Sequence, residues 1–166
     1  MKDLRLVELS EKEILVFTRP QGEVGGRGKI GTVIISKLEE LTHEVIDSAV
    51  LLDQFIDEEW GGVNAAYSLA DGKIGILGHI ASFDDAENRH YYSMTFTYDP
   101  ETKEFSPMSL LATRSMFMPG EAKRPDLVDV VFSGGLTFNE VAQEITLYVG
   151  ISDSHAQKIV LANPFQ

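Results

Sequence analysis

The feature of this sequence that most limits its fold is a four-strand pattern that starts three times along the chain. Short runs of β-branched and aromatic residues, bounded by turn residues, recur throughout, and helical periodicity is scarce. The runs fall into three sets, at about residues 4–52, 62–113 and 128–163. The first set ends with an expected strand over residues 45–52, and the last set lacks a fourth strand. The pattern therefore predicts an all-β chain built from antiparallel units.

The second strand of each set indicates that the units are repeats. Segments 13–19, 73–79 and 144–150 each begin with a charged residue, continue with Ile and then become mainly apolar. Four antiparallel strands per repeat are typical of β-propeller blades. We therefore expect residues 1–166 to form one partial β-propeller domain of about three four-stranded blades, the last incomplete. A β-sandwich with the same number of strands remains open as an alternative.

Three blades do not close a ring, because propellers have about four blades or more. An open blade leaves an unpaired strand edge, and such edges associate with other chains. We expect either a fragment of a longer propeller or a homo-oligomer that covers these edges.

Composition excludes several classes of partner. The net charge of −12 disfavours nucleic acid and anionic membrane surfaces, because both require a basic face. The chain has no Cys, which removes disulfides, thiolate nucleophiles and zinc–thiolate sites. No apolar run approaches the roughly 20 residues of a membrane helix, and the N-terminus shows no signal-peptide pattern. We expect a cytoplasmic protein.

Five short segments carry a resemblance to a known family. They are Leu77-Gly78-His79, Arg114-Ser115, the run Lys-Arg-Pro-Asp-Leu at 123–127, the run Val-Phe-Ser-Gly-Gly at 131–135 and the run Tyr-Val-Gly-Ile-Ser-Asp at 148–153. In order and spacing they resemble the five-bladed β-propeller clan that contains the family 130 glycoside hydrolases, the mannoside phosphorylases and their relatives. The likeness is greatest to an uncharacterised branch of that clan and covers roughly residues 27–165.

The resemblance implies the C-terminal part of a five-bladed propeller that binds or cleaves β-linked sugars at its axis. It implies a glycoside hydrolase or a phosphorylase, with inorganic phosphate as co-substrate in the second case and no other cofactor. The family's general-acid Asp lies in a segment of an earlier blade that this sequence lacks, and Ser133 replaces a proline. A noncatalytic carbohydrate-binding or scaffolding propeller is the alternative function.

Candidate sugar-binding residues follow from the repeat. Arg19 and His79 occupy the same place in aligned strands, where Gly150 stands in the third set. Either could bind a phosphate or a sugar hydroxyl, and a structural bond to a loop carbonyl is the alternative. Trp60 is a candidate stacking platform or a packing residue, and Asn64 is a candidate hydroxyl ligand or a turn cap.

A second group of candidates lies between the second and third sets. Arg114 and Arg124, which form a basic cluster with Lys123, are candidate phosphate ligands, and a salt-bridge network is the alternative. Asp126 and Asp129 are the catalytic candidates, since one or the other could act as acid or base.

The remaining candidates lie beyond strand ends. Asp153 and His155 are candidate substrate-binding residues, and turn capping is the alternative for Asp153. The histidines show no metal-ligand spacing, so no metal site is predicted. The glycine-rich segment 22–29 is either a flexible hairpin loop or a lid over the axis.

Overall fold

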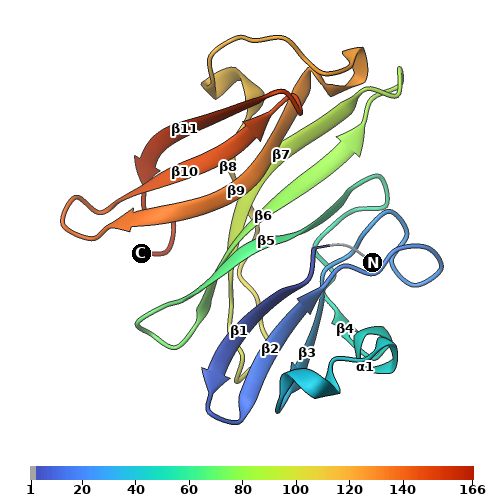
Figure 1. Cartoon of the computed structure of the whole chain (residues 1–166), viewed down its shortest axis with the longest axis vertical. Helices are drawn as coiled ribbons and strands as arrows, with labels where there is room; N and C mark the ends of the chain where they lie inside the picture. Colours follow the sequence, from blue (N-terminus) through green and yellow to red (C-terminus); the bar gives the residue numbers. More distant parts are fainter. Residues whose placement is uncertain (1–2) are drawn as a thin grey trace.

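The computed structural model describes residues 3–166, which form an all-β fold of three antiparallel meanders (Figure 1). The first meander comprises β1 (Arg5–Ser10), β2 (Glu13–Thr18), β3 (Gly31–Ile35) and β4 (Val50–Leu51). The second comprises β5 (Trp60–Ser68), β6 (Ile74–Phe83), β7 (Arg89–Tyr98) and β8 (Ser109–Ala112). The third comprises β9 (Asp129–Asn139), β10 (Glu144–Ile151) and β11 (His155–Ala162). The helical segments are short: η1 (Leu38–Glu40), α1 (His43–Asp47), η2 (Arg114–Met116) and η3 (Pro125–Leu127).

The three meanders form two sheets, where the sequence predicted three separate ones. The first sheet has the order β1-β2-β3-β4, and the second has the order β11-β10-β9-β7-β6-β5 with β8 paired to β7. Two parallel residue pairs, His90 with Asp129 and Tyr91 with Val130, join the second and third meanders. The connection over residues 113–128 makes this join, because it returns the chain so that β9 starts beside the start of β7.

The strands arise from alternation of apolar and polar residues, which places one set of side chains on each face of a sheet. In β10, Ile145, Leu147, Val149 and Ile151 are buried, whereas Tyr148 is exposed. The sequence of β10 alone therefore specifies which face packs against the rest of the molecule.

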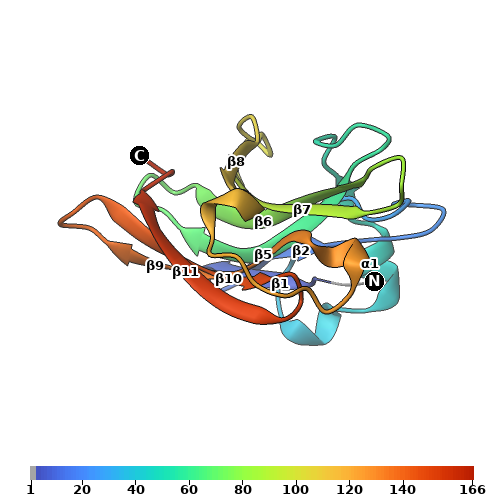
Figure 2. The same ribbon diagram turned by 90° about the horizontal axis from the view of Figure 1, so that it is seen from above.

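Two hydrophobic cores hold the meanders together. One joins the first meander to the second through residues that include Phe17, Ile76 and Phe96. The other joins the second meander to the third through residues that include Leu77 and Leu147. Seen from above, β8 and β11 lie on opposite sides of the β5–β7 strands (Figure 2). Because β6 supplies Ile74 and Ile76 to the first core and Leu77 to the second, both faces of this strand are packed.

One predicted strand is wrong for most of its length. Residues 45–52 were expected to be extended, but α1 covers the start of that range and only Val50–Leu51 form a strand. The Thr42 side chain caps the helix by accepting a hydrogen bond from the Val45 amide. A polar cap followed by Glu44 outweighed the β-branched residues of this short segment.

Within residues 3–166, the structure has no helix that is long and apolar enough to cross a membrane.

Candidate functional site

The structure brings Arg19 and His79 together over Gly62. A Cβ atom on Gly62 would lie 2.7 Å from Arg19 Cδ and 3.3 Å from His79 Cε1. Arg19 follows the end of β2, His79 lies within β6, and Gly62 lies on β5 opposite His79. Glycine at position 62 thus allows the side chains of Arg19 and His79, which come from different sheets, to lie close together.

His79 is fully buried and is held as a neutral imidazole. Its Nδ1 lies 2.8 Å from Asn64 Oδ1, and because an amide oxygen only accepts, Nδ1 carries the proton. The ring stacks on Tyr91, with centroids 5.7 Å apart and planes at 13°. Burial, and then the neighbouring positive charge of Arg19, lower the pKa of His79 from 6.5 to about 4.

Polar atoms of this cluster lack partners. Arg19 Nε, Asn64 Nδ2 and His79 Nε2 are buried without a hydrogen bond to any part of residues 3–166. Arg19 Nη1 is used, in an ion pair with Asp3 at 2.7 Å. Buried polar atoms are nearly always hydrogen-bonded in proteins, so this cluster is suited to hold a polar group from outside the chain.

An aromatic layer covers the cluster. Trp60 Nε1 donates to the Tyr91 hydroxyl at 3.1 Å. The guanidinium of Arg27 lies 5.3 Å from the Trp60 ring centre and 4.6 Å from that of Phe83. Trp60 is only 4% exposed, and Arg27 and Phe83 lie against it, so it acts in this structure as packing that supports Arg27.

These side chains line an open cleft of about 480 Å³. Its lining residues are Arg19, Gln21, Gly26, Arg27, Trp60, Phe83, Arg89 and Tyr91. Three of the six arginines in a chain of net charge −12 therefore meet in one cleft. We call it the arginine cleft.

A second hollow of about 510 Å³ adjoins the arginine cleft and shares two of its residues. It is lined by Arg89, Tyr91, Arg124, Leu127, Val130, Phe132, Gly150 and Asp153. At its margin Arg124 pairs with Asp126, whose carboxylate Arg89 also contacts. Asp153 pairs with Lys123 at 2.6 Å, which lowers the pKa of this exposed carboxyl.

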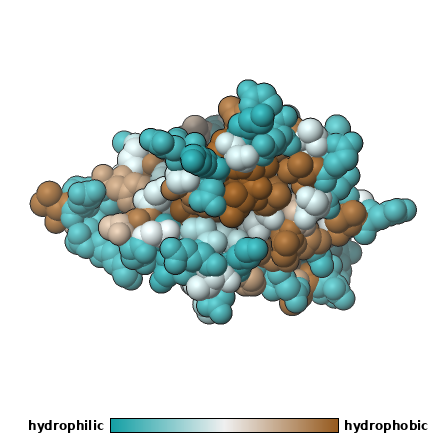
Figure 3. Space-filling view, turned by 90° about the horizontal axis from the view of Figure 1, so that it is seen from below, coloured by the Kyte–Doolittle hydropathy of each residue, from teal (hydrophilic) through white to brown (hydrophobic). Residues whose placement is uncertain are grey.

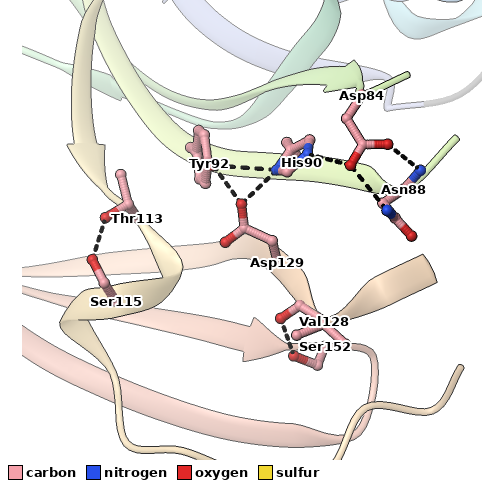
Figure 4. Close-up of polar contacts among 9 residues, drawn as sticks. All are labelled: Asp84, Asn88, His90, Tyr92, Thr113, Ser115, Val128, Asp129 and Ser152. Atoms are coloured by element: carbon pink, nitrogen blue, oxygen red, sulfur yellow. Dashed lines mark hydrogen bonds and ion pairs between the residues drawn. The ribbon is translucent and has the colours of Figure 1, made fainter. Parts of the chain in front are cut away.

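Asp129 belongs to a separate polar group (Figure 4). His90 Nδ1 lies 2.6 Å from Asp129 Oδ2, and the Tyr92 hydroxyl donates to the same oxygen. The hydrogen bond to Asp129 raises the pKa of His90, and burial followed by the Asp129 interaction raises that of Tyr92 to about 12. Asp126 and Asp129, both candidates for acid or base chemistry, thus have different partners.

The structure does not bring Arg114 and His155 to either hollow. Arg114 bonds to the Ser152 hydroxyl and to the carbonyls of Phe117 and Met118, as expected of a residue that fastens a loop. His155 is exposed, with only a long contact of 3.4 Å to Ser154. No three His, Asp or Glu side chains of residues 3–166 gather so as to hold a metal ion.

Sequence reasoning missed Arg89, Tyr91 and Phe83, and it noted the loop that contains Arg27 without selecting that residue. Arg89 and Tyr91 begin β7, and Phe83 ends β6, so all three lie at the hairpin end next to His79. The available signal was the hairpin itself, since pairing across it places residues 79–83 beside residues 89–93.

Comparison with known proteins gives a family and several solved relatives. A family model described as "Protein of unknown function (DUF1861)" matches residues 1–166. No curated protein matches the chain. A solved mannose phosphorylase from Leishmania mexicana, in complex with phosphate ion, is 36% identical with a TM-score of 0.89. The alignment covers 99% of this chain and 52% of that one.

Two further structures are similar. A hypothetical protein from Leishmania major is 36% identical with a TM-score of 0.87, over 100% of this chain and 53% of that one. A GDP-Man-dependent mannosyltransferase from Leishmania mexicana is 32% identical with a TM-score of 0.85, over 100% of this chain and 52% of that one. The chain thus spans about half the length of these solved relatives.

Proposed function

The chain belongs to the DUF1861 family, and we propose that it forms the phosphate-binding part of a phosphorylase-like site that acts on mannose-type sugars. The observation that carries the proposal is the arginine cleft, with Arg19, Arg27 and Arg89 on one surface of an acidic chain. Guanidinium groups bind phosphate through paired, charge-assisted hydrogen bonds. The relatives support the choice of ligand, because one is a mannose phosphorylase in complex with phosphate ion.

In this proposal the cluster of Arg19, Asn64 and His79 opens to the sugar part of such a ligand, because its unpartnered polar atoms are buried in the free chain. Arg19 Nε and Asn64 Nδ2 are donors without partners, and His79 Nε2 is an acceptor without one. A sugar hydroxyl both donates and accepts, so it can satisfy donors and an acceptor together. A bare anion can satisfy only the donors.

In phosphorolysis a phosphate oxygen bonds to the anomeric carbon as the glycosidic C–O bond breaks. The leaving oxygen then takes a proton, and a carboxylic acid supplies it in most glycosidases. Asp126 is engaged by two guanidinium groups in the free protein, whereas Asp129 has His90 beside it. Asp129 lines neither hollow, so its candidate role in proton transfer depends on the adjacent His90 and is tested below.

The three meanders support the partial propeller as the scaffold of this site. Each meander has the sequential antiparallel order of a propeller blade, and the relatives with similar folds are about twice as long. In this proposal the remaining blades complete the ring and the site. The chain then carries the sugar- and phosphate-binding residues of one side.

A titration with inorganic phosphate tests the proposed site. Replacement of Arg27 by Ala should weaken phosphate binding about tenfold, because it removes a charged hydrogen-bond donor from the cleft. Lys29→Ala is the matched control, because Lys29 is an exposed cation of the same loop and does not line the cleft. If R27A and the unchanged protein bound phosphate with equal affinity, the proposal would be contradicted.

The catalytic part has its own measurement, which is release of mannose 1-phosphate from β-mannosides in the presence of phosphate. D129N should lose this turnover and retain phosphate affinity. Sugar and phosphate binding without turnover by the unchanged chain would instead support the second candidate, a noncatalytic carbohydrate-binding protein. The missing general-acid segment in the sequence favours that second candidate.

A further inference from the structure

The Asp126 carboxylate is held by two arginines in a further hollow of about 700 Å³, which shares Arg27, Phe83 and Arg89 with the arginine cleft. Arg124 Nε lies 3.1 Å from Asp126 Oδ1, and Arg124 Nη2 lies 3.2 Å from Oδ2. Arg89 Nη1 donates to the same Oδ2 atom. One carboxylate therefore occupies the hydrogen-bonding groups of two guanidinium ions, in the way that a bound anion would.

The charges at this point do not balance. Within residues 3–166, Arg89 and Arg124 form ion pairs with Asp126 alone, so these pairs set two positive charges against one negative charge. The nearby Asp153 carboxylate is paired with Lys123 and interacts with Arg124 only at longer range. A phosphate group carries up to two negative charges and three acceptor oxygens. It therefore matches the two guanidinium groups better in charge and in number of acceptors than Asp126 does.

The position is accessible from solvent. The side chains of Arg89, Arg124 and Asp126 are 34%, 57% and 30% exposed. Arg89 lines both hollows, and the same Phe83 ring contacts Arg89 and Arg27. A ligand in the arginine cleft therefore lies next to the Asp126 carboxylate.

We propose that Arg89 and Arg124 form a second anion subsite, which Asp126 fills in the free protein and a phosphate group of the ligand takes over. The inference rests on the proposed function in that the first phosphate group occupies the arginine cleft. Because Arg89 borders both positions, a compound with two linked phosphate groups spans them. Asp126 then competes with the ligand for the two arginines and so weakens ligand binding. Rotation of the Asp126 side chain would free both guanidinium groups.

Calorimetric titration with pyrophosphate tests this subsite. D126N should bind pyrophosphate about tenfold more tightly than the unchanged protein, because the competing negative charge is gone. D85N is the charge-matched control from the nearby β6–β7 turn and should leave the affinity unchanged. The double variant D126N/R124Q should lose the gain. Unchanged or weaker binding by D126N would overturn the proposal.

A second measurement uses the unchanged protein and needs no variant to fold. The carboxyl ¹³C signal of Asp126 should shift during titration with pyrophosphate, because the carboxylate leaves its two partners. A constant signal at saturation would also overturn the proposal. The two tests give separate answers. If D126N does not tighten pyrophosphate binding, only the second subsite is contradicted. If R27A binds phosphate as tightly as the unchanged protein, only the first is contradicted.

Discussion

At the scale of single residues, the neutral state of His79 is the most consequential feature of the site. Its imidazole has no exposed surface and lies between Asn64 and the Tyr91 ring, with Arg19 adjacent. A proton on Nε2 would place a charge in a buried space beside another cation. His79 is therefore uncharged at neutral pH, whereas the neighbouring Arg19 is charged and is paired with Asp3.

This state predicts a particular loss of stability in acid. The pKa of His79 is about 4 in the folded chain and near 6.5 when unfolded, so only the unfolded chain takes up the proton between these values. Stability from His79 is thus complete above pH 6.5 and falls as pH decreases toward 4, by on the order of 3 kcal/mol. Urea unfolding at several pH values measures it.

H79Q should lack this part of the pH dependence, because glutamine does not titrate. H155Q should retain it, since His155 is exposed on the surface. Parallel stability profiles of H79Q and the unchanged chain would show that His79 is not the responsible group.

At the scale of elements, Ser133 of β9 ties three strands together. Its hydroxyl lies 2.7 Å from the Gly78 carbonyl of β6 and 2.8 Å from the Ser93 hydroxyl of β7. Since a hydroxyl has one proton, Ser133 donates to the carbonyl and accepts from Ser93. This buried group fixes β9 beside His79, which follows Gly78 directly.

Ser133→Ala should lower the free energy of unfolding by about 1–3 kcal/mol, because it leaves buried polar groups without a partner. Thermal and urea unfolding measure the change. Ser154→Ala is the control, because Ser154 is exposed and should change stability little. A stability equal to that of the control would mean that water replaces the Ser133 hydroxyl.

The strands could largely be predicted from the sequence because alternation and turn residues are local signals. Ile145 to Ile151 alternates clearly, and Asp71-Gly72 lies in the turn between β5 and β6. The pairing of β7 with β9 depends on a long connection, and no local pattern specifies it. The residues of the site divide in the same way into local and non-local ones. The aligned strands indicated Arg19 and His79, whereas Arg89 reaches the cleft only because the β6–β7 hairpin folds.

At the scale of the whole molecule, strand edges remain open. Within residues 3–166, β11 pairs only with β10, so the outer edge of β11 has no strand partner. Apolar side chains also gather in the middle of the face seen from below, with hydrophilic ones around them (Figure 3). Open edges and apolar surface are both features of association sites, so the homo-oligomer expected from the sequence stays a prediction.

Light scattering at micromolar concentration should therefore show a species larger than the 18.4 kDa monomer. V160E should shift the population toward the monomer, because Val160 lies on the open strand β11 and is 56% exposed. V141E is the matched control, because Val141 is 97% exposed on the β9–β10 turn. A monodisperse monomer of the unchanged chain would contradict this prediction.

Trp60 has a consequence for how this molecule can be observed. It is the only indole of the chain, and it contacts Arg27, Tyr91 and Phe83 in the arginine cleft. Light absorbed at the red edge of the protein spectrum is therefore emitted from this one place. The emission of this intrinsic fluorophore therefore reports on the arginine cleft without a label and without a contribution from other residues.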